Sequence, residues 1–120
     1  MFEYDQEFSP KAPAELREIV ENPRRSVVYR GRSIAALGRK AKDDPSLIDD
    51  LLRWASDPVY QRTKWYGGVT LAWTAALAVG YSQSDPSACE RLSQVLATWD
   101  PRDLAALRSW SRHETWLDGV

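Results

Sequence analysis

The sequence contains few of the residues that most often carry enzyme chemistry. Its 120 residues include one histidine, His113, and one cysteine, Cys89, which lie far apart in the chain. A lone cysteine cannot form a disulfide within the chain and excludes a metal site built from several cysteines. The phosphate- and zinc-binding motifs GxGxxG, GxxxxGK[ST] and HExxH are also missing. We therefore predict a protein that is not an enzyme, with no catalytic residue, no metal site and no cofactor.

The chain also has almost no net charge and no long apolar run. Sixteen basic residues against seventeen acidic ones leave a formal net charge of −1, which favours neither a nucleic-acid nor a membrane-surface role. The longest apolar stretch, 69–80, is shorter than the roughly 20 residues of a membrane-spanning helix. Residues 1–9 are acidic and lack the basic-then-apolar build of a secretory signal. We expect a cytoplasmic protein with no membrane association.

What the sequence does contain is a regular series of prolines that follow small polar residues. Ser, Asn and Asp accept hydrogen bonds from the first turn of a helix, and proline fits at the first helical position. Each such pair therefore predicts a helix start. The pairs are Ser9-Pro10, Asn22-Pro23, Asp44-Pro45, Asp57-Pro58, Asp85-Pro86 and Asp100-Pro101.

The spacing of these pairs indicates a repeat of helix pairs. Successive steps are 13, 22, 13, 28 and 15 residues apart, so short and long segments alternate. Apolar residues recur at helical spacing in 47–55, and a shift of 41 residues finds the same stripe in 88–96. The sequence predicts an all-α fold of about six helices in antiparallel pairs. We expect an arm at 1–9, one domain at 10–113 and a tail at 114–120.

The run Arg32-Ser33-Ile34-Ala35-Ala36-Leu37-Gly38, followed by Asp44-Pro45, Leu51-Leu52 and Asp57-Pro58, resembles a HEAT-type repeat. The resemblance is to the short bacterial form found in phycobilisome-lyase-like proteins, and it covers roughly residues 12–112. It implies a short α-solenoid whose short helices line the concave face. It also implies, as one alternative function, a lyase that handles a chromophore.

The second long segment departs from this repeat. It is six residues longer than the first and contains Gly67-Gly68, and each glycine inside a helix costs about 1 kcal/mol relative to alanine. We expect a break there, with 58–66 forming a separate turn or short helix.

Seven basic residues and no acidic one lie between Pro23 and Lys42. Arg25, Arg32 and Arg39 are seven apart, which predicts one shared helix side with Tyr29 between them. This side is either a solvated face paired with neighbouring acids, such as Glu15, Glu18, Asp49 and Asp50, or a patch for an acidic partner or phosphates.

The inserted segment 60–66 interleaves aromatic and basic side chains, a composition typical of interface hot spots. Its candidate binding residues are Tyr60, Arg62, Lys64, Trp65 and Tyr66. The alternative is that Trp65 and Tyr66 pack across a repeat junction.

The six tryptophans divide by position. We interpret Trp54 and Trp73 as core residues and expect Trp99 to close a helix junction. Trp110 and Trp116 either cover the end of the stack or await a partner. Cys89 lies on the apolar stripe and is interpreted as a small core residue.

These observations support a protein-interaction module: a small adaptor, inhibitor or immunity-type protein that binds another protein, acidic if the basic residues carry the contact. The alternatives are a HEAT-like nucleic-acid-binding domain, which would show a steep salt dependence, and the lyase implied by the resemblance.

Overall fold

The computed structural model describes residues 7–82 and 86–110, most of which are helical. The elements are α1 (Pro13–Glu21), α2 (Val27–Lys40), α3 (Ser46–Ala55), α4 (Pro58–Arg62), β1 (Lys64–Tyr66), β2 (Val69–Thr70), α5 (Leu71–Ser82), α6 (Pro86–Leu96) and α7 (Pro101–Trp110). The predicted all-α class is confirmed. Within the described residues there are seven helices rather than about six, and α4 is the additional one.

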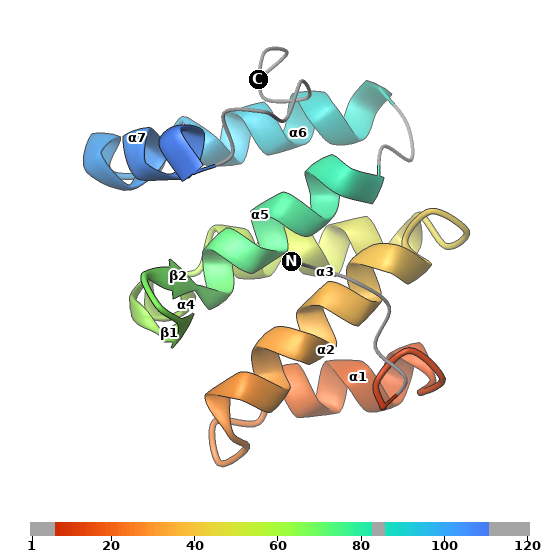
Figure 1. Cartoon of the computed structure of the whole chain (residues 1–120). Helices are drawn as coiled ribbons and strands as arrows, with labels where there is room; N and C mark the ends of the chain where they lie inside the picture. The colour runs from red at the N-terminus through yellow and green to blue at the C-terminus, as the bar shows by residue number, and fades with distance from the viewer. Residues whose placement is uncertain (1–6, 83–85, 111–120) are drawn as a thin grey trace.

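The helices lie in successive tiers (Figure 1). The view shows α1 and α2 at the bottom, α3 and α5 in the middle, and α6 and α7 at the top. The long helices α2 and α5 pack against each other, and the short helices α3 and α6 are also in contact. Helix α5 touches α2, α3, α4 and α6, which explains why it is apolar on every side.

Four of the six predicted helix starts agree with the structure to within a residue. Helices α4, α6 and α7 begin at Pro58, Pro86 and Pro101, and α3 begins directly after Pro45. The carboxylate of Asp57 accepts from the Val59 N–H at 2.8 Å, and that of Asp100 accepts from the Arg102 N–H at 2.8 Å. The capping argument is therefore correct at these positions.

The other two predicted starts are wrong. Helix α1 begins at Pro13, because residues 7–10 form a turn that buries Phe8 in the core, with 1% of the residue exposed. Helix α2 begins at Val27, where the Ser26 hydroxyl accepts from the Val28 N–H at 3.2 Å. Asn22 instead accepts from the Arg24 N–H at 3.0 Å and forms a turn after α1.

The predicted break at the glycine pair is confirmed. Gly67 has a φ of +55°, a left-handed conformation that suits glycine, and it reverses the chain between β1 and β2. These two strands pair antiparallel, with Lys64 opposite Thr70. The expected short helix is α4, but the pattern did not predict strands in 64–70.

Two tryptophans occupy the predicted positions. Trp54 is 2% exposed, and Trp99 is buried where its indole N–H donates to the Ala55 carbonyl at 2.9 Å. This bond ties the end of α6 to the end of α3. Trp73 and Cys89 are half-buried. His113 and Trp116 lie outside the described residues, as does the side chain of Trp110.

Candidate functional site

The predicted arginine side does not form as expected. Arg25 precedes α2 and lies in the turn after α1, so it shares no helix side with Arg32 and Arg39. Its guanidinium lies 3.5 Å from the Glu18 carboxylate, and both side chains are about half exposed. One of the pairings that the solvated-face alternative anticipated is therefore present.

The N-terminal turn covers much of the basic side of α2. Arg32 lies over the Phe8 ring, with 4.9 Å to its centroid, and 3.7 Å from the Glu7 carboxylate. Arg39 donates to the Ser9 hydroxyl at 3.3 Å. Residues 7–9, which belong to the expected N-terminal arm, thus pack against α2 and use its cations as partners.

Tyr60 belongs to the core rather than to an exposed insertion. It is 9% exposed, and its ring stacks on Trp54 with the planes 7° apart. Its hydroxyl donates to the Val20 carbonyl at 3.3 Å, and the Arg30 side chain donates to the same oxygen at 2.8 Å. Because α1 has no basic residue in its last turn, buried Arg30 supplies the positive charge that its C-terminus favours.

Burial gives Tyr60 a testable pH dependence. Loss of hydration raises the pKa of its phenol above the ordinary 10.0, although the hydrogen bond and charge of Arg30 oppose the shift. Because the pKa is higher in the folded state, the stability that Tyr60 contributes below about pH 10 is lost as pH rises through the folded-state pKa. We expect the Tm of the wild type to fall more steeply above pH 10 than that of Tyr60→Phe.

The exposed Tyr29 provides the matched control for this pH series. Tyr29→Phe should retain the wild-type pH profile in thermal unfolding followed by circular dichroism. If Tyr60→Phe also retained that profile, the effect of burial on the Tyr60 phenol would be contradicted.

Trp65 packs between helices, as the alternative interpretation of the insertion anticipated. Its indole N–H donates to the Thr74 hydroxyl at 2.6 Å, and its ring lies so close to Gly31 that an added Cβ would be 2.2 Å away. The two basic residues of the insertion, Arg62 and Lys64, are exposed. The side chain of Tyr66 is not among the parts of the chain that the structure describes.

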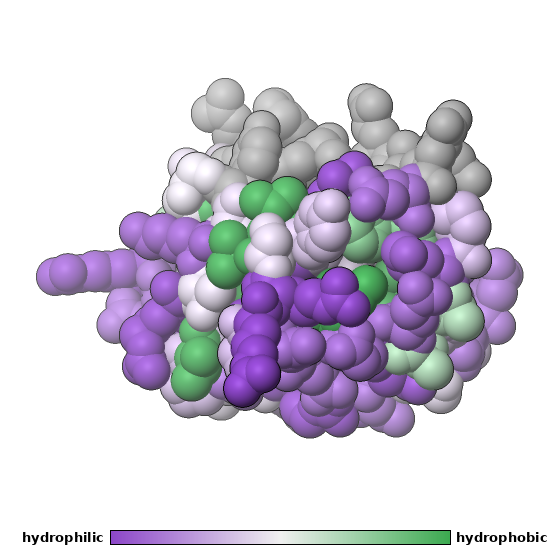
Figure 2. Space-filling model, turned by 90° about the horizontal axis from the view of Figure 1, so that it is seen from below, coloured by the Kyte–Doolittle hydropathy of each residue, from purple (hydrophilic) through white to green (hydrophobic). Residues whose placement is uncertain are grey.

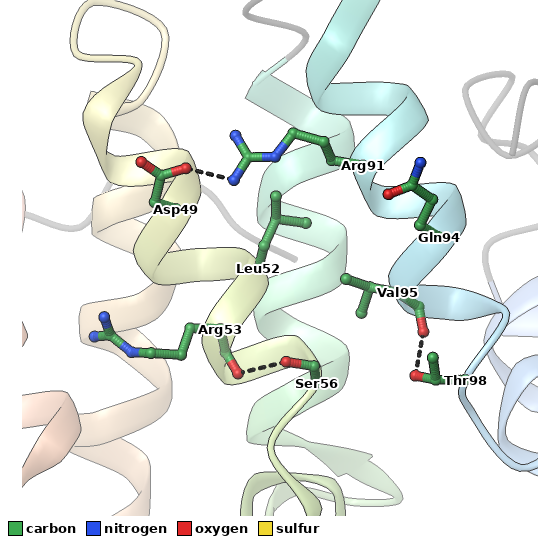
Figure 3. A pocket seen from close by; sticks show the side chains of 8 residues that line it. All are labelled: Asp49, Leu52, Arg53, Ser56, Arg91, Gln94, Val95 and Thr98. Atoms are coloured by element: carbon green, nitrogen blue, oxygen red, sulfur yellow. Dashed lines mark hydrogen bonds and ion pairs between the residues drawn. The ribbon is translucent and has the colours of Figure 1, made fainter.

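A groove that the residue patterns did not predict lies between α3 and α6. Figure 3 shows side chains from the two helices facing each other across it. Its volume is about 360 Å³, and its lining residues are Asp49, Leu52, Arg53, Ser56, Arg91, Gln94, Val95 and Thr98. The groove therefore combines apolar, charged and amide side chains in one open site.

Charged, apolar and amide side chains line different parts of the groove. Arg91 and Asp49 form an ion pair that bridges the two helices (Figure 3). Leu52 and Val95 supply apolar surface. The exposed Gln94 amide makes no hydrogen bond with any described residue, so it can both donate to and accept from a ligand.

A second set of ion pairs joins α3 to α1 beside the groove. Arg17 of α1 lies 2.6 Å from the Asp50 carboxylate of α3, and Arg53 of α3 lies 3.3 Å from Glu21 of α1. Within α3, Arg53 also lies 3.2 Å from Asp50. Asp49 and Asp50, which the solvated-face alternative named as partners of the basic side, instead pair with Arg91 and Arg17 on neighbouring helices. These partners lie outside the basic segment 23–42.

Within residues 7–82 and 86–110, no three potential metal-ligating side chains cluster, and no helix is long and apolar enough to cross a membrane. No family model, curated protein or solved structure matches this chain.

Proposed function

We propose that this protein is a short HEAT-like solenoid that acts as a non-catalytic interaction module, binding an extended segment of a partner protein in the groove between α3 and α6. The observation that carries the proposal is the groove itself. It is open, it lies between two adjacent helices, and it offers apolar surface together with an amide that has no partner among the described residues.

The lining suits a peptide because it meets both needs of an extended chain. Leu52 and Val95 provide contact area for an apolar side chain. Gln94 can pair with the N–H and C=O groups of a peptide bond, which otherwise lose hydrogen bonds on leaving water. Arg91 pairs with Asp49 through one guanidinium nitrogen, and its other N–H groups can donate to a peptide carbonyl.

The arrangement of helices supports the solenoid part of the proposal. Short helices α3 and α6 lie side by side, and long helices α2 and α5 also contact each other, as stacked helix pairs require. The groove then lies on the short-helix face, which the HEAT resemblance assigns to the concave side. Solenoids use such surfaces for extended partners.

The proposal predicts that blocking the groove abolishes peptide binding. Peptides selected on the wild-type protein from a displayed random library would be titrated, by fluorescence anisotropy, into Gln94→Trp and Glu90→Trp. Both positions are exposed on α6, but only Gln94 lines the groove. We expect Gln94→Trp to weaken binding at least about tenfold, and Glu90→Trp to leave it within about twofold of the wild type.

Two results would contradict the groove as the binding site. One is a selection that yields no peptide above background, and the other is a set of selected peptides none of which binds Gln94→Trp more weakly than the wild type. Circular dichroism of both variants would show that the helices are intact, so a loss of binding would report on the groove rather than on folding.

A further inference from the structure

A second surface lies at the end of the molecule where α1 ends, α2 begins and α4 follows α3. The Val20 carbonyl accepts from Arg30 of α2 and from Tyr60 of α4, so three segments meet at one oxygen atom. The contact between Gly31 and Trp65 brings β1 to the same part of α2. Figure 1 shows α4, the hairpin and the start of α2 on the left of the molecule.

Three exposed valines lie on two of the helices that meet here, α2 and α4. Val27 and Val28 in the first turn of α2 are 38% and 42% exposed, and Val59 of α4 is 57% exposed. These three valines and Tyr29 are the large apolar residues that are exposed in the described part of the chain. In the view from below, hydrophobic side chains emerge among hydrophilic ones (Figure 2). The core does not need these valines, and their exposure leaves apolar area for a partner.

The cations at this end have no acidic partner within the described residues. Arg24, Arg62 and Lys64 are exposed, and no described carboxylate lies within ion-pair distance of any of them. Arg17, Arg25 and Arg53, by contrast, are each paired with a carboxylate. The end therefore presents positive charge that an external acidic group can match.

We infer that these six residues form a docking surface for an acidic partner protein, separate from the groove. The surface, called here the valine–arginine surface, comprises Arg24, Val27, Val28, Val59, Arg62 and Lys64. The partner would place apolar side chains on the valines and carboxylates on the surrounding cations. None of these six residues lines the groove, so the chain would hold two partner segments and act as an adaptor.

The valines favour a protein over a nucleic acid. Nucleic-acid binding gains affinity mainly from phosphate contacts with Lys and Arg, a term to which three exposed valines add nothing. Protein interfaces combine an apolar centre with a polar rim, which is the pattern here. A single-stranded DNA oligonucleotide is therefore the discriminating probe.

The test begins with a displayed random-peptide library depleted on Val27→Ser/Val28→Ser/Val59→Ser and then selected on the wild type. Because the substituted side chains are exposed, the variant should fold, and circular dichroism would verify this. We expect the surviving peptides to be enriched in Asp and Glu together with large apolar residues. Their affinity should fall at least about tenfold in Arg24→Glu/Arg62→Glu.

The matched control is Lys42→Glu/Arg102→Glu, which changes the net charge equally at exposed positions outside the surface. It should leave the affinity within about threefold of the wild type. The small loss would come from weaker long-range attraction, because the net charge has changed. Gln94→Trp should not affect these peptides, so failure here and failure of the groove are distinguishable.

Three outcomes would overturn the inference. These are no survivors after depletion, survivors without acidic enrichment, or equal loss of affinity in the control variant. Binding of the oligonucleotide that is steeply salt-dependent and lost in Arg24→Glu/Arg62→Glu would assign the surface to nucleic acid instead.

Discussion

Trp54→Ala is expected to lower the free energy of unfolding by about 3–5 kcal/mol, the usual cost of removing a fully buried tryptophan. The side chain is 2% exposed, stacks on Tyr60 with ring centroids 6.4 Å apart, and belongs to the core cluster that spans α1 to α7. Domains of this size are stabilised by about 5–15 kcal/mol in total. The variant should therefore unfold at a much lower urea concentration than the wild type.

Trp54→Phe separates packing from hydrogen bonding at the same position. The Trp54 indole N–H is buried and has no hydrogen-bond partner among the described residues, and an unpaired buried donor costs about 1–3 kcal/mol. Phenylalanine loses part of the ring volume but removes that donor. We expect a net loss below about 1.5 kcal/mol, and a loss as large as that of Trp54→Ala would contradict this account. Val59→Ala, at an exposed position, should change stability by less than about 0.5 kcal/mol.

The helix starts show how far local sequence patterns can predict this fold. At Asp57-Pro58 and Asp100-Pro101 the carboxylate accepts from N–H groups of the first helical turn, as the local pattern predicts. Asn22-Pro23 has the same local chemistry, yet Ser26 lies four residues further on and caps α2 instead. The choice between a turn and a helix start depends on where the chain must reverse to pack α2 on α1, and that is tertiary information.

The aromatic insertion was difficult to interpret for a related reason. Tyrosine and tryptophan are enriched both in interface hot spots and in cores, because each combines a large apolar ring with a hydrogen-bonding group. Tyr60 and Trp65 find internal partners in Val20 and Thr74, which are 40 and 9 residues away in the chain. Composition alone could not distinguish these partners from those of a binding surface.

The groove could be predicted only in part. The shift of 41 residues that relates 47–55 to 88–96 indicates that α3 and α6 present equivalent apolar faces. Which residues line the space between them depends on how far α5 holds the two helices apart. The Asp49–Arg91 pair, 42 residues apart, follows from that separation. Sequence periodicity therefore indicated the two helices, and their packing determined the site.

The second large effect is expected at the contact between Gly38 of α2 and Ala78 of α5. A Cβ added at Gly38 would lie 2.6 Å from the Ala78 Cβ and 3.2 Å from its Cα, so the α5 backbone itself blocks a side chain. Gly38→Leu would force the two central helices apart, and we expect it to cost about 3 kcal/mol or more in urea unfolding. Gly68→Ala is the control, because nothing lies within 4 Å of its added Cβ. It should change stability by less than about 0.5 kcal/mol.

A double-mutant cycle tests whether close approach is the cause. Alone, Gly38→Ala should lower the free energy of unfolding by about 1–2 kcal/mol, because the clash exceeds the gain in helix propensity of about 1 kcal/mol. In an Ala78→Gly background the nearer contact is gone, so the same substitution should cost much less or become stabilising. An equal cost in both backgrounds would show that Gly38 is required for a reason other than the packing of α2 on α5.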